Sequence, residues 1–160
     1  MRTTDIEQFR YLVLAAQREG NRRLAVALAP LGLTPSQAEV LGVLADVGPL
    51  TLSGLGELLV CESGTNPSRL VGRLVDAGMV RRDAVADDGR QVQLSLTDLG
   101  RERAAAARRA DDELHAHLRA RLGTADVTAL VTALASVVED TPAGRAISRR
   151  NSLHAERSSS

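Results

Sequence analysis

Apolar residues recur three and four positions apart over residues 5–29, with charged residues between them. This spacing predicts an amphipathic helix with one buried face. Pro30 ends it, because proline lacks the backbone N–H that a helix needs. The run TPSQ at 34–37 then has the order of a capping box, in which the threonine and the glutamine each bond the backbone of the other. A second helix is therefore predicted to follow and to end at Gly48.

Two further helices follow, and the second of them exposes polar and basic side chains. A short helix is predicted over 52–60, and the next begins near Asn66, a good N-cap, and ends at Gly78. The apolar residues that share one face of this last helix are Leu70, Val71, Leu74 and Val75. The residues that this packing turns outward or onto the flanks are Ser68, Arg69, Gly72 and Arg73.

The period changes from helical to alternating after Gly78. Residues 92–96 alternate between apolar and polar types, which predicts a strand with Ser95 on its wet face. A preceding segment, 80–86, can pair with it across the Asp-Gly pair at 88–89, the strongest short hairpin signal. Helices followed by such a hairpin form a winged helix-turn-helix. The predicted fold class is therefore mainly α (α+β).

Helices also dominate the C-terminal part of the chain. Thr97 caps a long helix that reaches about Leu122, and Thr124 caps a last helix over 125–139. Residues 141–160 carry four arginines against one glutamate and end in three serines. This composition predicts a flexible basic tail.

Composition excludes several classes of protein. The 160 residues have a formal net charge of zero and are 44% hydrophobic but only 1% aromatic, so a core of Leu, Val and Ala is expected. No apolar run approaches the roughly 20 residues that span a bilayer, and the N-terminus lacks the apolar region of a signal peptide. We therefore expect a cytoplasmic protein without a membrane partner.

The sequence shows no set of residues that is typical of an enzyme active site. The chain has no Gly-rich phosphate loop, no nucleophile elbow and no convincing Ser/His/acid grouping, so neither an enzyme nor a cofactor is predicted. Asp111 and His115 lie one helical turn apart and could supply half of a metal site, but a surface ion pair is the favoured interpretation. No metal is predicted.

The predicted architecture suits binding to double-stranded DNA. In a winged helix-turn-helix the second helix of the pair lies in the major groove, and the wing reaches the backbone or the minor groove. The residues suited to base edges and phosphates near the start of that helix are Ser63, Thr65, Asn66, Ser68, Arg69 and Arg73. Arg90, at the hairpin turn, is placed to enter a minor groove, where narrow A·T-rich stretches concentrate negative potential.

Residues 33–101 resemble the MarR family of bacterial transcription regulators. The matching segments are LTPSQAEVLGVL, LTLSGLGELL, PSRLVGRLVDAGMVRR, DDGR and LSLTDLG. The resemblance implies one domain over 1–140, in which 33–101 form the DNA-binding lobe and 5–29 and 98–140 supply dimerisation helices. It further implies a homodimer that binds a palindromic operator. We expect this regulator to be a repressor, with an activator as the alternative.

The family resemblance also suggests roles for particular residues. Asp88 and Arg90 match the family's Asp-x-Arg pattern, in which the acid orients the arginine for the minor groove. A small-molecule effector would bind in the cleft between the dimerising helices and the lobe and release the DNA. Candidate lining residues are Phe9, Tyr11 and Leu44.

Two alternative functions stay open at this stage. Residues 49–103 hold seven arginines and eight acidic residues, so the lobe lacks a strongly basic signature. A winged-helix protein-interaction module without DNA binding fits that balance. Cys61 lies near the start of the helix that is predicted to enter the major groove, which we call the recognition helix. Its thiol would suit a redox-sensing regulator, although a free cysteine is more often a buried structural residue.

Overall fold

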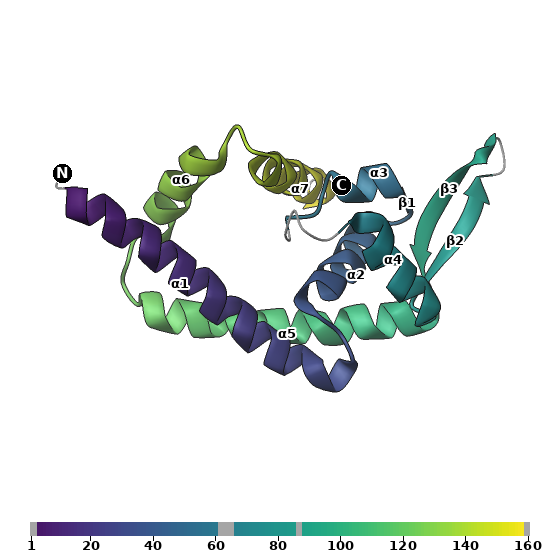
Figure 1. Cartoon of the computed structure of the whole chain (residues 1–160), viewed down its shortest axis with the longest axis horizontal. Coiled ribbons are helices and arrows are strands. Elements are labelled where there is room, and N and C mark those ends of the chain that lie inside the picture. Colours follow the sequence, from purple (N-terminus) through teal and green to yellow (C-terminus); the bar gives the residue numbers. More distant parts are fainter. Residues whose placement is uncertain (1–2, 61–65, 86–87, 159–160) are drawn as a thin grey trace.

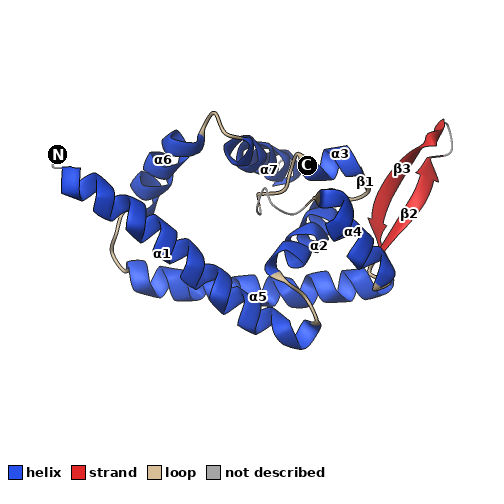
Figure 2. Ribbon diagram, in the orientation of Figure 1, coloured by secondary structure: helices blue, strands red, loops and turns tan. Residues whose placement is uncertain are grey.

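The computed structural model of the chain describes residues 3–60, 66–85 and 88–158, and Figure 1 and Figure 2 show its helices and its one small sheet. The elements are α1 (Thr3–Leu28), the 3-10 turn η1 (Ala29–Leu31), α2 (Pro35–Val47), β1 (Leu50–Thr51), α3 (Leu52–Gly56), α4 (Pro67–Asp76), β2 (Val80–Val85), β3 (Asp88–Leu96), α5 (Asp98–Leu122), α6 (Val127–Val138) and α7 (Pro142–Ser158). The predicted mainly helical class with a winged helix-turn-helix is confirmed.

Side-chain caps explain where several of these helices begin. The capping box at the start of α2 is complete, because the Thr34 side chain accepts from the Gln37 amide and the Gln37 side chain accepts from the Thr34 amide. Thr97 caps α5 as predicted. The predicted cap at Thr124 is wrong, since Asp126 accepts from the Ala129 amide at 3.0 Å and α6 starts after it.

One hydrophobic core lies inside the lobe formed by α2, α3, α4 and the sheet. Its fully buried large side chains are Leu28, Leu41, Leu55, Leu74, Val40, Val71 and Val80. The first half of α5 closes this core with three buried alanines, whose small side chains let the helix approach closely: Ala104, Ala107 and Ala110. α6 buries no residue at all. The core therefore holds the lobe together and leaves α6 outside it.

The sheet has three antiparallel strands in the order β1-β3-β2. The β2–β3 ladder runs in register from Val80 opposite Leu96 to Ala84 opposite Val92, and then shifts so that Val85 lies opposite Asp88. The predicted turn at 88–89 is therefore wrong, because Asp88 is already part of β3. β1 was not predicted, since two residues are too few to show an alternating pattern.

The hairpin is fixed to the start of α5 by a close approach of two backbones. The Thr97 hydroxyl donates to the carbonyl oxygen of Gly78 at 2.7 Å, and the Thr97 amide donates to that of Met79 at 3.1 Å. Gly100 is buried against the same Met79 carbonyl, which a Cβ at this position would overlap. A residue without a side chain is therefore required here, and the wing is held rigidly on α5.

The C-terminal segment corrects another prediction. Instead of a loose tail over 141–160, the structure has α7 over Pro142–Ser158. The corner before it is tight, because the Thr141 hydroxyl donates to Val138 at 2.7 Å and accepts from the Gly144 amide at 3.0 Å. Thr141 thus caps a helix whose first residue is a proline, which is a favourable start.

The helices outside the lobe form an open arch (Figure 1). α1 and α5 cross, α6 leads away from the far end of α5, and α7 returns to the lobe beside α3. Among the described residues no single helix is long and apolar enough to cross a membrane, and the two helix pairs that reach that length together are bent by 75° and 110°.

Candidate nucleic-acid interface

α4 is an amphipathic helix with its polar face in solvent. Leu70, Val71 and Leu74 are buried against the lobe, while Ser68, Arg69 and Arg73 are exposed. This confirms the orientation that the helical period predicted. Asn66 is also exposed and caps the helix, because its side-chain oxygen accepts from the Ser68 amide at 2.9 Å.

The exposed face of α4 carries only positive charge before its last residue. Arg69 and Arg73 lie one turn apart on it. In the part of the chain that the structure describes, none of the seven ion pairs involves either of them. Within the described residues, both guanidinium groups are therefore available to an external acceptor such as a guanine edge or a phosphate.

The structure describes only some of the remaining predicted interface residues. Ser63 and Thr65 lie outside the described residues, as does Cys61, so the redox alternative stays a prediction. Asp88 and Arg90 belong to β3, in the half of the strand next to the hairpin connection. The hairpin projects from the lobe beyond α4 (Figure 1).

A polar cluster at the base of the wing was missed by the sequence analysis. Ser95 was predicted on the wet face but is only 8% exposed. Its hydroxyl donates to Asp83 at 2.5 Å, and Arg81 donates to Asp83 at 2.9 Å and to Ser95 at 3.0 Å. The Ser95 hydrogen bond, followed by that of Arg81, lowers the pKa of Asp83 below its ordinary value.

Replacing Ser95 with alanine is expected to raise the pKa of Asp83 toward its ordinary value of 3.8. Because the folded pKa lies below that of the unfolded chain, this carboxylate stabilises the fold above about pH 3.8, and its contribution is lost as the pH falls through the folded value. Carbon-detected NMR titration of the carboxylate measures the shift. Ser53→Ala, in α3, is the control, and an unchanged Asp83 titration in Ser95→Ala would show that the hydrogen bond is unimportant.

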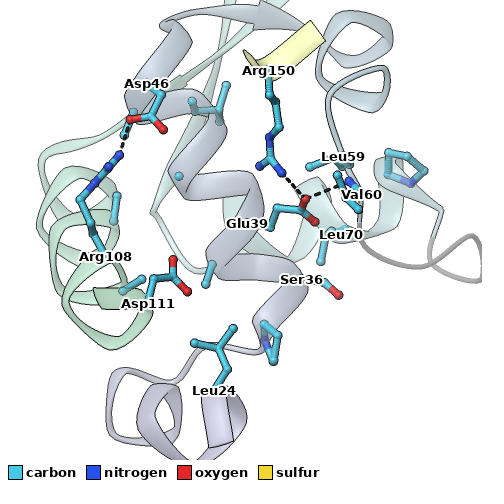
Figure 3. A pocket seen from close by; sticks show the side chains of 18 of the residues that line it. Leu24, Ser36, Glu39, Asp46, Leu59, Val60, Leu70, Arg108, Asp111 and Arg150 are labelled. Carbon is cyan, nitrogen blue, oxygen red and sulfur yellow. Dashed lines mark hydrogen bonds and ion pairs between the residues drawn. The ribbon is translucent and has the colours of Figure 1, made fainter. Parts of the chain in front are cut away.

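A large open cavity of about 2090 Å³ lies between the lobe and α1, α5 and α7 (Figure 3). Leu24 of α1, Asp46 of α2 and Asp111 of α5 are on its wall, and Arg108 of α5, which also lines the cavity, pairs with Asp46. Burial raises the pKa of Asp111 above its usual range. Of the predicted effector residues, Leu44 is on this wall.

Two of the predicted effector residues lie elsewhere. Phe9 and Tyr11 are exposed on α1 and are not part of the cavity wall. The sequence analysis places these two residues in a pocket only because they are aromatic. In the structure, the N-terminal half of α1, which carries them, extends past the lobe. No group of three His, Cys, Asp or Glu residues that could hold a metal ion is found within the described ranges.

A helix pair with an exposed second helix, followed by a hairpin fixed to α5, defines a winged helix-turn-helix protein. The family profile described as "MarR family" matches residues 31–91. A crystal structure of a probable transcriptional regulator from Pseudomonas aeruginosa is 32% identical, with a TM-score of 0.62, and the match covers 76% of this chain and 93% of that one. The chain belongs to the MarR family of winged-helix transcriptional regulators, which are not enzymes.

Two further solved structures are similar. A cysteine-to-serine mutant of MarR from E. coli, complexed with operator DNA, is 27% identical over 84% of this chain and 96% of that one, with a TM-score of 0.72. An organohalide-sensing transcriptional regulator in its 2,4-dichlorophenol-bound form is 16% identical over 89% and 86%, with a TM-score of 0.74, and supports the fold alone. No curated protein matches the sequence.

Proposed function

We propose that this regulator binds a palindromic operator in double-stranded DNA as a homodimer and represses transcription in the cytoplasm. The observation that carries the proposal is the α4 face, on which Ser68, Arg69 and Arg73 are exposed and neither arginine takes part in an ion pair of the described chain. The likeness to MarR complexed with operator DNA supports it. α4 would enter the major groove while the wing follows the backbone.

The proposed subunit interface uses α1 and the region from α5 to α6. α6 is almost wholly apolar yet buries none of its residues, and the N-terminal half of α1 is also exposed. The exposed large apolar side chains of these segments are Ile6, Phe9, Tyr11, Leu12, Val13, Leu14, Leu118, Leu122, Val127, Leu130, Val131, Leu134 and Val137. Many large apolar side chains exposed on neighbouring parts of the chain are typical of a protein interface. A second copy of the chain is the partner we propose, because a palindrome requires two-fold symmetry.

We propose that α4 and the wing make different kinds of contact with DNA. Arg69, Arg73, Ser68 and Asn66, together with Ser63 and Thr65, would contact base edges and nearby phosphates in the major groove. Asp88 and Arg90 of the wing would anchor the protein at the minor groove. Two-fold symmetry would then space the half-sites about 34–36 Å apart along the duplex.

Arg90→Ala is expected to weaken binding to all duplexes by a similar factor. Ser68→Ala or Arg69→Ala should instead change base preference as well, each lost specific contact costing about 1–3 kcal/mol. Fluorescence anisotropy with the operator and with single-base variants measures both effects. An equal loss on every sequence for all three variants would contradict this division of labour.

An effector role for the cavity is a second proposal. Its wall joins α1 and α5, which belong to the proposed dimer interface, to α2 of the lobe. A small molecule bound there would change the spacing of the two α4 helices only if it binds one spacing better than the other. Titrating candidate small molecules into the protein–DNA complex and following release of the duplex tests this role.

Salt dependence separates DNA binding from the alternative of a protein-interaction module. A protein that contacts phosphates loses affinity steeply as salt rises, because the release of counterions on binding is less favourable when the bulk salt concentration is higher. We therefore expect the affinity for a duplex from the regulator's own promoter region to fall with a clear negative slope against salt concentration. An absence of binding at low ionic strength would favour the protein-interaction module.

A further inference from the structure

The C-terminal helix α7 folds back onto the helix-turn-helix and is joined to it by two ion pairs. Arg149 donates to Glu57 at 2.5 Å, and Arg150 donates to Glu39 of α2 at 2.8 Å. Leu153, one turn further on, packs against the lobe core. Two of the four arginines on which a basic tail was predicted are therefore already paired with acids of the lobe.

The Arg150 pair differs from the Arg149 pair in burial and in what it touches. The side chains of Arg150 and Glu39 are 29% and 14% exposed, whereas those of Arg149 and Glu57 are 50% and 56% exposed. The Glu39 oxygen that accepts from Arg150 also accepts from the backbone amide of Val60, at 2.8 Å. Figure 3 shows both hydrogen bonds meeting at this one carboxylate.

Val60 lies in the segment that connects α3 to α4. It follows α3 and is the last described residue before Asn66, which caps α4. The Glu39 bond therefore holds the chain at Val60, between α3 and α4 in the sequence. A hydrogen bond to a shielded carboxylate is stronger than one between exposed neutral groups, and Arg150 orients that carboxylate through its own hydrogen bond.

We infer that α7 is a brace for the helix-turn-helix, in which Arg150 is a positioning residue that holds α4 in its DNA-binding geometry through Glu39 and Val60. The inference rests on the proposed function, since it concerns how that DNA surface is held. In this arrangement an N–H donor of Arg150 is engaged by Glu39, so the role we assign to the residue is positioning and not contact with DNA. Loss of the brace loosens the start of α4 without removing a phosphate contact.

Arg150→Gln tests the brace, with Arg149→Gln as a control that removes the same charge from the same helix. In the free protein, NMR hydrogen exchange should show the Val60 amide exchanging about tenfold faster in Arg150→Gln and unchanged in Arg149→Gln. Affinity for the duplex should fall by about tenfold in Arg150→Gln only, with the same salt slope as the wild type. Arg150→Lys should restore both properties, since it keeps a positively charged N–H donor to the carboxylate, whereas glutamine offers only a neutral one.

Several outcomes would overturn the inference. Unchanged Val60 exchange in Arg150→Gln would show that no brace exists. Equal losses of affinity in both glutamine variants, with a salt slope reduced by about 0.9, would show that α7 contacts phosphates instead. If Arg150→Gln melts at a much lower temperature and Arg150→Lys does not restore Val60 protection, the residue merely stabilises the fold. If the wild type binds no duplex, the proposed function fails, and Val60 exchange still decides whether Arg150 holds the turn.

Discussion

Replacing Leu130 with aspartate is expected to convert the protein to monomers and to weaken operator binding by at least about a hundredfold, because the avidity of two linked half-sites is lost. Leu130 lies on α6, where its side chain is 44% exposed in the single chain. In the proposed dimer it is covered by apolar residues of the second copy, and a carboxylate there would be buried without a partner. Sedimentation velocity measures the subunit mass, and anisotropy measures the affinity.

Leu52→Asp is the matched control, since this leucine is also exposed but lies on α3 in the lobe. It should leave the sedimentation of the protein unchanged. Circular dichroism checks that both variants keep their helices. A Leu130→Asp protein that still sediments as a dimer would show that α6 is not in the subunit interface.

Leu74→Ala is expected to lower the free energy of unfolding by about 2–5 kcal/mol, the usual cost of truncating a buried leucine. Leu74 is fully buried on the inner face of α4, so its removal leaves a cavity where the recognition helix meets the lobe. Chemical denaturation measures the change.

The neighbouring variant Arg73→Ala should affect DNA binding and not stability. Arg73 is exposed, so its loss should change the free energy of unfolding by less than about 0.5 kcal/mol while weakening DNA binding. The pair thus separates the two faces of α4. Similar losses of stability in both variants would mean that the described orientation of the helix is incorrect.

The parts of the fold that sequence predicted well are governed by local rules. The outward direction of Arg69 and Arg73 follows from the helical period alone, because four apolar residues fix the inner face of α4. Capping at Thr34 and Thr97 likewise depends on residues three positions away.

The missed features depend on contacts between distant residues. α7 is joined to the lobe by Arg150 and Glu39, which are 111 positions apart, and no local pattern reports that proximity.

The misplaced hairpin turn had a further consequence, since a two-residue turn at 88–89 would set Ser95 opposite Arg82. The observed register sets Ser95 opposite Arg81 instead, which brings it to Asp83 as well. A shift of one residue in a strand pair changes every partner across it.

Selection of duplexes from a random DNA pool, followed by native mass measurement of the complex, tests the central claim most directly. We predict enrichment of an inverted repeat whose half-site centres lie about one helical turn, or a multiple of it, apart, with two chains bound to each duplex. Enrichment of no sequence at low salt, or a complex of one chain with a single unrepeated site, would contradict a two-fold pair of α4 helices reading adjacent grooves.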